Sequence, residues 1–228
     1  RELQFPQSSQ LGEVRDGVDG VDGLALARAL VLSPDGAHLY VVGEADNAVA
    51  ALARDASDGT LDFVEFHTDG VGGVSGLAGA RAVAISPDGA QVYVAGGTAN
   101  AVALFTRQTS NASPDFGKLT FVTAYVDGAA GVDGLQGAAA ILVSPDPVGS
   151  DPGGQHVYVA GRGEDAVAVF TRNELTGALT WSSAARQGQA GVEGLTGPVA
   201  LLASPEAQNL YAAGAGDDAV VTFDRDWD

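Results

Sequence analysis

Apolar residues along the chain fall into short runs of about five, separated by turns rich in Gly, Pro, Asp and Ser. The runs at 81–85 and 101–107 are examples, and both consist largely of Val and Ala. No segment places apolar residues at positions i, i+3, i+4 and i+7 over three turns, which is the pattern of an amphipathic helix. The pattern therefore predicts an all-β protein built from short strands.

The predicted strands belong to a unit that recurs along the chain. A Ser-Pro turn opens each unit, and a Tyr-centred apolar run follows it, at Tyr40, Tyr93, Tyr158 and Tyr211. The next strand has an Ala-Val pattern and closes on Arg54, Arg107, Arg172 or Arg225. A last strand carries Leu-x-Phe or Leu-x-Trp in the first three units. Four-stranded units of about 50 residues are typical of the blades of a β-propeller.

We predict a single β-propeller domain over residues 1–228, with four blades of four antiparallel strands. The blades are expected at residues 12–66, 67–124, 125–185 and 186–228. The last unit lacks a fourth strand, and Leu3-Gln4-Phe5 has its pattern, so residues 1–11 would complete the last blade and close the circle. Four blades are few for a propeller, so two chains that form a larger ring are the alternative.

The composition excludes several classes of function. With 29 acidic against 11 basic residues and a net charge of −18, the chain would repel the phosphates of a nucleic acid. No apolar run is long enough for a transmembrane helix. The chain has no Cys, so it has no thiolate ligand or nucleophile, and it has no Met. A cleaved leader or an excised segment would explain the missing Met. With one Lys and many Asp, we expect a periplasmic or extracellular protein.

Gly-rich acidic loops join each blade to the next and offer candidate cation ligands. Aligned on a shared Leu, the loops place oxygen-bearing side chains at two recurring positions. The candidate metal ligands are Asp16, Asp22, Asp69, Asp127, Asp133 and Glu193. Such positions would form rings of oxygen atoms about the propeller axis, and Ca²⁺ is the candidate cofactor because it prefers hard oxygen ligands. Asp-Gly pairs are also ordinary turn formers, so turn chemistry alone stays open.

The turns between second and third strands lie on the same face as these loops. The candidate binding residues are Asp46, Asn47, Asn100, Glu164, Asp165, Asp217 and Asp218, together with Trp227 beyond the last strand. This face could receive a basic protein surface, a cation or a sugar. The alternative is an acidic rim that is solvated and keeps the protein in solution.

Catalytic nucleophiles and bases have little support in the sequence. His38 and His156 occupy equivalent places in the repeat, where the other units carry Gln91 and Asn209. A position that accepts Gln or Asn is more simply a polar turn flank than a general base. The Gly-x-Ser-x-Gly, His-Glu-x-x-His and phosphate-binding Gly-Lys-Ser motifs do not occur in the sequence. We therefore assign no catalytic residue from the sequence.

One repeat carries a recognisable pattern. From Gly76 to Gly96 it reads Gly-Leu-x-Gly-Ala-x-x-Val-x-x-Ser-Pro-Asp-Gly-x-x-Val-Tyr-Val-Ala-Gly, and Ala101 to Arg107 continues it. It resembles the YVTN-type and lactonase-like β-propeller repeats of bacterial secreted proteins, over nearly the whole chain. The resemblance implies the fold, whereas such repeats serve as enzymes, binding platforms and assembly modules. Lactonase-like members work with polar and basic groups that converge on the central funnel, and the repeats indicate no such group here.

We therefore predict a non-enzymatic secreted propeller that binds a protein partner or joins a larger assembly, with a homo-oligomer as one form. The alternative is a lactonase-like hydrolase with its site at the mouth of the central channel. A third reading is a structural subunit that makes contacts through the insertion 147–154 and Trp227. An enzyme should bring unlike polar residues together at the channel mouth, whereas a binding module should have near-symmetric loops.

Overall fold

The computed structural model describes residues 12–145 and 154–225, which contain fifteen β-strands and no helix. The all-β prediction is therefore confirmed for these residues. None of them forms a helix that could span a membrane. The first sheet contains β1 (Ala27–Leu32), β2 (His38–Gly43), β3 (Ala48–Arg54) and β4 (Leu61–Thr68). The second contains β5 (Ala80–Ile85), β6 (Gln91–Gly96), β7 (Ala101–Arg107) and β8 (Leu119–Val126).

The third and fourth sheets repeat this plan. The third contains β9 (Ala138–Val143), β10 (His156–Gly161), β11 (Ala166–Arg172) and β12 (Leu179–Arg186). The fourth contains β13 (Pro198–Ala203), β14 (Asn209–Gly214) and β15 (Ala219–Asp224). Within the described residues the fourth sheet has three strands. The predicted completion of this sheet by residues 1–11, and most of the insertion 147–154, lie outside the described residues.

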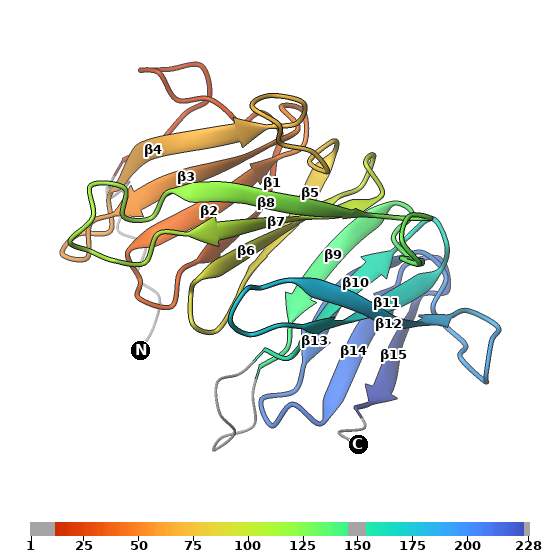
Figure 1. Cartoon of the computed structure of the whole chain (residues 1–228). Coiled ribbons are helices and arrows are strands. Elements are labelled where there is room, and N and C mark those ends of the chain that lie inside the picture. The colour runs from red at the N-terminus through yellow and green to blue at the C-terminus, as the bar shows by residue number, and fades with distance from the viewer. Residues whose placement is uncertain (1–11, 146–153, 226–228) are drawn as a thin grey trace, which may run out of the picture.

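The four sheets follow one another along an arc, with β1–β4 at one end and β13–β15 at the other (Figure 1). Their first strands are neighbours in the order β1, β5, β9, β13, and no comparable contact between described strands joins β13 back to β1. This is the blade arrangement of a propeller, with the first strands innermost. The circular closure that we predicted is not made by the described strands.

Alternating side chains of each inner sheet pack against its two neighbours. On β6, Val92 and Val94 belong to the core shared with the first sheet, whereas Tyr93 and Ala95 belong to the core shared with the third. All four side chains are fully buried. Successive side chains of a strand point to opposite faces of its sheet, so one strand contributes to the apolar cores on both sides. We call the boundary between two neighbouring sheets, with its apolar core, a seam.

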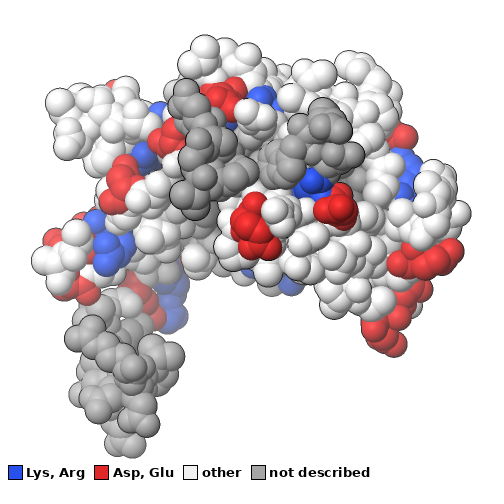
Figure 2. All heavy atoms as spheres, turned by 90° about the horizontal axis from the view of Figure 1, so that it is seen from below, with Lys and Arg blue, Asp and Glu red and all other residues white. Residues whose placement is uncertain are grey.

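The Ser-Pro turns have the predicted geometry. Gly36 and Gly89 adopt φ of 71° and 72°, which glycine reaches without steric cost. In both turns the Ser hydroxyl donates a hydrogen bond of 2.5 Å to the following Asp, Ser33 to Asp35 and Ser86 to Asp88. These turns lie at the lower end of the sheets in Figure 1, and Figure 2 views the molecule from that side. Acidic groups form separate small patches there rather than one continuous surface.

Candidate functional site

A β-bulge interrupts each first strand at the end that receives the acidic loop. The register with the second strand skips one residue there, between Ala27 and Ala29 in the first sheet and at the equivalent place in the others. The four bulged residues are Arg28, Arg81, Ala139 and Val199. A bulge re-aims its extra residue away from the regular alternation and is frequent beside functional sites. Because the first strands are innermost, these residues lie at one mouth of the central channel.

Two of the bulged residues share one carboxylate. The Nε–H of Arg28 donates to Oε2 of Glu44, and the Nε–H of Arg81 donates to Oε1 of the same side chain at 3.0 Å. Glu44 lies in the turn between β2 and β3, and its side chain is 15% exposed against 50% for Arg28. The hydrogen bond from Arg28 lowers the pKa of Glu44, and burial opposes this less than the two arginines favour it. The carboxylate is therefore ionised at neutral pH.

The Arg28–Glu44–Arg81 cluster retains unused donors. Within the described part of the chain, neither guanidinium group has a further partner for its terminal nitrogens. A planar guanidinium binds carboxylate, phosphate or a developing oxyanion through such N–H groups. Gly97 makes room for the stem of Arg81, since a Cβ there would lie 3.0 Å from Arg81 Cδ. The cluster carries a net positive charge and is pre-arranged to receive an anionic oxygen.

The repeat pattern did not indicate this cluster, because its loops are near-symmetric while its bulge positions are not. The bulge carries Arg, Arg, Ala and Val in the four sheets. The turn position of Glu44 is occupied by Gly97, Arg162 and Ala215 in the other three. Unlike polar residues therefore do converge at the channel mouth. Aligning these two positions would have found them.

The acidic loops use their first oxygen for turn formation. Asp16, Asp69, Asp127 and Gln187 each accept the backbone N–H of the Leu eight residues later, at 2.7–3.0 Å. We predicted rings with one oxygen ligand from each sheet, but the acidic groups that the described residues form are different. Carboxylates instead gather within single sheets, as Asp16, Asp22 and Asp46 in the first and as Asp127, Asp133 and Glu164 in the third. In each group the oxygen atoms lie within 4.8 Å of one another.

The two acidic groups differ in whether an arginine lies beside them and balances their negative charge. Arg186 lies beside the third-sheet group, 2.6 Å from Asp133 and 3.6 Å from Glu164. No described Lys or Arg pairs with Asp16, Asp22 or Asp46, which makes the first-sheet group the better candidate for a cation. The remaining predicted ligands stand apart from both groups: Asp69 has no acidic companion there, and Glu193 accepts Gln187 Nε2 at 2.9 Å. Cation binding remains a prediction.

Most of the predicted binding residues accept hydrogen bonds from backbone N–H groups. Asn47, Asn100 and Asp165 each accept the N–H of a glycine at the start of the next sheet, at 2.7–2.8 Å. Asp46 and Asp217 each accept a backbone N–H of their own sheet at 2.8 Å. Asp218 is exposed, and Trp227 lies outside the described residues. A docking role for this face remains a prediction.

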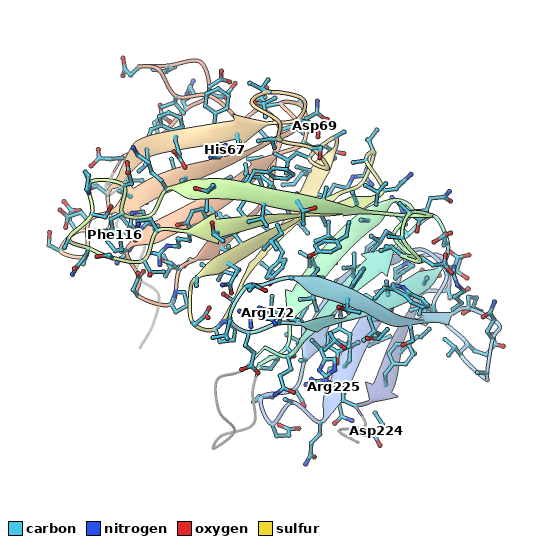
Figure 3. All side chains as sticks on the ribbon, in the orientation of Figure 1. His67, Asp69, Phe116, Arg172, Asp224 and Arg225 are labelled. Carbon is cyan, nitrogen blue, oxygen red and sulfur yellow. The ribbon has the colours of Figure 1, made fainter. Side chains whose placement is uncertain are left out.

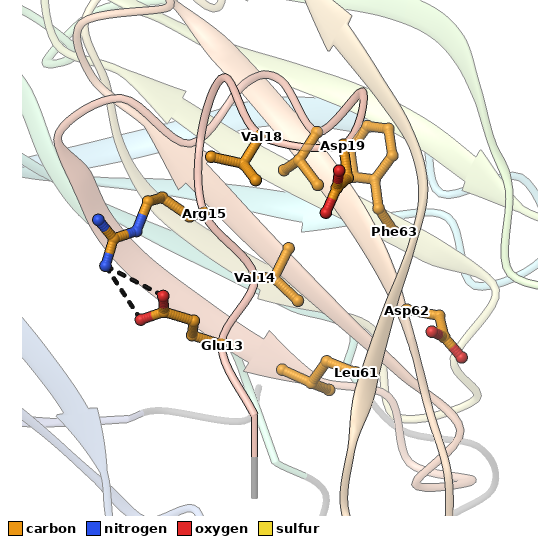
Figure 4. A pocket seen from close by; sticks show the side chains of 9 residues that line it. Glu13, Val14, Arg15, Val18, Asp19, Leu61, Asp62 and Phe63 are labelled. Carbon is orange, nitrogen blue, oxygen red and sulfur yellow. Dashed lines mark hydrogen bonds and ion pairs between the residues drawn. The ribbon is translucent and has the colours of Figure 1, made fainter. Parts of the chain in front are cut away.

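A cleft of about 700 Å³ lies between residues 13–21 and β4 (Figure 4). Val14 and Val18 line it opposite Phe63, with the exposed Arg15–Glu13 ion pair at its edge. A similar cleft of about 530 Å³ lies one sheet further along, with the acidic loop 69–76 facing β8. Because the cleft recurs with the repeat, we treat it as a seam between blades rather than a site.

The opposite mouth of the channel is apolar. A hollow of about 460 Å³ there is lined by residues of all four sheets, among them Pro34, Ile85, Leu142 and Leu202. It contains no charged side chain. Among the described residues, the polar groups of the channel therefore lie at the bulged ends of the first strands.

The sequence matches a family model described as lactonase, 7-bladed beta-propeller, over residues 22–125 and 108–228. A search of curated proteins found no match. Among solved structures, a Bacteroides uniformis protein provisionally assigned as a 6-phosphogluconolactonase aligns with a TM-score of 0.69 at 20% identity, over 88% of this chain and 51% of that one. The periplasmic gluconolactonase of Pseudomonas aeruginosa aligns with a TM-score of 0.65 at 23% identity, over 88% and 50%.

Hydrazine synthase of Kuenenia stuttgartiensis is also similar, with a TM-score of 0.60 at 20% identity over 97% of this chain and 49% of that one. The chain thus spans about half the length of the solved structures it matches. At these identities the structural likeness shows the propeller fold alone, since one fold serves many functions.

Proposed function

The chain belongs to the lactonase family of β-propellers, and from that premise we propose that it is a lactonase-like hydrolase whose site is the Arg28–Glu44–Arg81 cluster. The prediction of a non-enzymatic binding module is wrong, because the family match and the lactonases among the structural relatives contradict it. They favour the alternative of a hydrolase at the channel mouth. The activity is proposed from this chain's own residues, because the chain spans half of its solved relatives.

Hydrolysis of a lactone develops a negative charge on the carbonyl oxygen and moves one proton from the attacking water to the ring oxygen. Water adds to the ring carbonyl carbon, the carbonyl oxygen becomes an oxyanion, and the bond from that carbon to the ring oxygen breaks. The carbonyl re-forms, the ring oxygen takes the proton that the attacking water loses and becomes a hydroxyl, and the new carboxylic acid ionises and releases a proton. Fixed N–H donors that face the oxyanion lower the barrier because they need no reorganisation. We propose that the terminal nitrogens of Arg28 and Arg81, which have no partner among the described residues, act as such donors.

Glu44 has a different part in this scheme. Its lowered pKa makes it a weak base, and it is bonded to both arginines. We therefore assign it the positioning of the two guanidinium groups rather than proton abstraction. Removal of Glu44 would leave two like charges side by side at the channel mouth. The observation that carries the proposal is this shared carboxylate, which holds the Nε groups of both arginines within hydrogen-bond distance of one side chain.

The test is acid release from glucono-δ-lactone, followed at constant pH with the uncatalysed rate subtracted. Arg81→Gln and Arg28→Gln should each lower kcat/KM by about 10²-fold or more, as loss of an oxyanion donor does. Arg15→Gln is the matched control, because Arg15 is an exposed arginine that pairs with Glu13 and lines the cleft beside β4 rather than the cluster. Wild-type protein that does not exceed the blank rate, or variants with unchanged rates and melting temperatures, would contradict the proposal.

We also propose that the protein acts in the periplasm or outside the cell. The acidic composition, with 29 acidic residues against 11 basic ones and a single Lys, supports this, and one structural relative is a periplasmic enzyme. Fractionation of cells that express the full-length protein tests it. Recovery with the cytoplasmic fraction would overturn it.

A further inference from the structure

The turn between the second and third strands of an inner sheet lies beside the bulged residues of two sheets. In the first sheet this turn carries Glu44, which bonds to Arg28 of its own sheet and to Arg81 of the next sheet. Figure 3 labels Asp69, whose backbone N–H donates to this turn at 3.0 Å and which therefore marks this end of the sheets. In the second sheet the same turn position is Gly97.

Gly97 lies directly beneath the stem of Arg81. A Cβ on Gly97 would lie 3.0 Å from Arg81 Cδ, 3.1 Å from Arg81 Nε and 3.1 Å from Ala138 O, which is closer than side chains normally pack. The backbone does not require glycine, because the φ of Gly97 lies outside the positive range. Glu44 also faces a following sheet, so a neighbouring backbone oxygen alone does not demand glycine either. The arginine stem that crosses Gly97 accounts for the missing side chain.

The backbone around the cluster is held in place independently of Arg81. Asn47 Oδ1 accepts the N–H of Gly79, two residues before Arg81, at 2.7 Å. The N–H of Gly97 donates to Gly79 O at 2.9 Å. A Cβ on Gly79 would lie 2.4 Å from Thr98 Oγ1, so β5 and this turn are in close contact. The turns of both sheets and the start of β5 are therefore bonded together, and only the direction of the Arg81 side chain is left to be set.

The residue in the turn decides where a bulged arginine bonds. In the first sheet the turn carries a carboxylate, and Arg28 of the same sheet donates to it. Position 97 offers Arg81 no such partner within its own sheet. The Arg81 stem instead passes over Gly97, and its Nε–H reaches Glu44 of the preceding sheet at 3.0 Å.

We propose that Gly97 is a positioning residue, which directs Arg81 to the preceding sheet so that two arginines share one carboxylate. Gly97 acts through Arg81 and contacts no substrate. Its effect on the reaction rests on the proposed function, whereas its effect on Arg81 can be measured without a substrate. Gly97→Glu would give Arg81 a carboxylate within its own sheet and add a negative charge to the cluster, which weakens its stabilisation of an oxyanion.

The test without substrate follows the Arg81 Nε–H signal in proton–nitrogen correlation spectra, assigned by its loss in Arg81→Gln. In the wild-type background, Glu44→Gln should shift this signal strongly, because an amide replaces the carboxylate that accepts the hydrogen bond. In the Gly97→Glu background, Glu44→Gln should leave the signal nearly unmoved, because Arg81 then bonds to residue 97. Equal shifts in the two backgrounds would overturn the proposal.

The second test is kcat/KM for glucono-δ-lactone. Gly97→Glu should lower it by about 10-fold or more, as partial loss of an oxyanion donor does. Adding Arg81→Gln should then cost less than it does in the wild type, because both substitutions act on one interaction. Ala215→Glu is the matched control: it makes the same change at the same turn position of the fourth sheet, whose bulged residue is Val199, and should leave kcat/KM unchanged.

Gly97→Ala is the milder variant, and it decides the question if Gly97→Glu does not fold. The new Cβ has to move the Arg81 stem by a few tenths of an ångström, so the Arg81 signal should shift and kcat/KM should fall by about 3-fold. The melting temperature should stay that of the wild type, since Ala215 occupies the equivalent position.

Two kinetic results would overturn the proposal in an active wild-type protein. One is an unchanged kcat/KM in both Gly97 variants. The other is a loss in Gly97→Glu that simply adds to the loss in Arg81→Gln, because independent effects add. A wild-type protein without lactonase activity would contradict the proposed function instead, and the spectra would then decide whether Gly97 positions Arg81.

Discussion

Two boundaries between sheets share one hydrogen bond but differ in how their apolar core is covered. Arg107 donates to the Tyr40 hydroxyl between the first and second sheets, and Arg225 donates to the Tyr158 hydroxyl between the third and fourth. In the first seam, Phe121 of β8 packs edge-on against Phe105 at 5.5 Å, and Phe116 lies 5.3 Å from the Arg107 guanidinium. In the last seam the described residues provide no fourth strand, and a cleft of about 260 Å³ remains beside Phe223 and Arg225. The Arg–Tyr hydrogen bond therefore joins two sheets, whereas the side chains of the fourth strand cover the apolar core between them.

The largest expected difference concerns the aromatic residue at the equivalent position of each seam. Phe105→Ala should lower the free energy of unfolding by about 3–5 kcal/mol, because Phe105 is fully buried and its removal leaves a cavity. Phe223→Ala should cost about 1–2 kcal/mol, because Phe223 is partly exposed beside an existing cleft. Urea unfolding of both variants measures this. Equal losses would mean that the last seam is as well sealed as the first.

Replacement of Tyr40 and of Tyr158 should change the free energy of unfolding by amounts that differ less. Tyr40→Phe removes both the bond to Gly117 O and the acceptor for Arg107, and should cost about 2 kcal/mol. Tyr158→Phe removes the acceptor for Arg225, the one bond of its hydroxyl that the described residues show, and should cost about 1 kcal/mol. Thermal unfolding at matched concentration distinguishes them. A larger loss at Tyr158 would contradict the comparison.

The two acidic groups extend the comparison to the loops. We expect a few millimolar Ca²⁺ to stabilise the protein by about 1 kcal/mol through Asp16, Asp22 and Asp46, as a weak calcium site would. Asp22→Asn should abolish this shift in melting temperature. Asp133→Asn is the matched control, because Arg186 already compensates its group. A shift that Asp133→Asn removes and Asp22→Asn leaves would reverse the assignment.

The smallest effect concerns pH. Burial, and then the charge of Arg107, lower the pKa of His38 below its ordinary 6.5, so folding favours the neutral ring. The unfolded chain takes up the proton first, so this stability is complete above pH 6.5 and is lost as the pH falls below it. Between the second and third sheets, Gln91 occupies the position of His38 and accepts a hydrogen bond from Arg172.

His38→Gln should therefore flatten the dependence of unfolding free energy on pH between about 5 and 7. Burial likewise lowers the pKa of His156 in the last seam, so the variant with both replacements should be flatter still. Urea titrations at several pH values measure this. A slope that neither replacement changes would show that these rings do not control it.

A lower window belongs to Asp35. Its burial would raise its pKa, but hydrogen bonds from Ser33, Ala37 and Arg107 outweigh burial and lower the pKa to about 2. The stability contributed by this carboxylate is therefore present above its ordinary pKa of 3.8 and is lost as the pH falls toward 2. Its carboxylate is partly exposed, so solvent screens the contribution.

Much of the fold could be predicted from the sequence, because the repeat carries it. The strand predicted at Ala101–Arg107 is observed with those bounds, and Leu119 begins a fourth strand as expected. The closure of the circle by residues 1–11 stays a prediction, because these residues lie outside the described part of the chain. The site was missed for a local reason: a bulge breaks the alternation from which the direction of Arg28 or Arg81 would be inferred.

The bulge at the start of each first strand has a consequence for how such proteins diversify. Its extra residue is skipped by the pairing with the second strand, so its side chain can change while the hydrogen-bonded ladder stays as it is. Within this one chain the same place already carries Arg, Arg, Ala and Val on nearly identical backbones. Gene duplication would copy the scaffold faithfully, and mutation at this single position would give each copy its own chemistry.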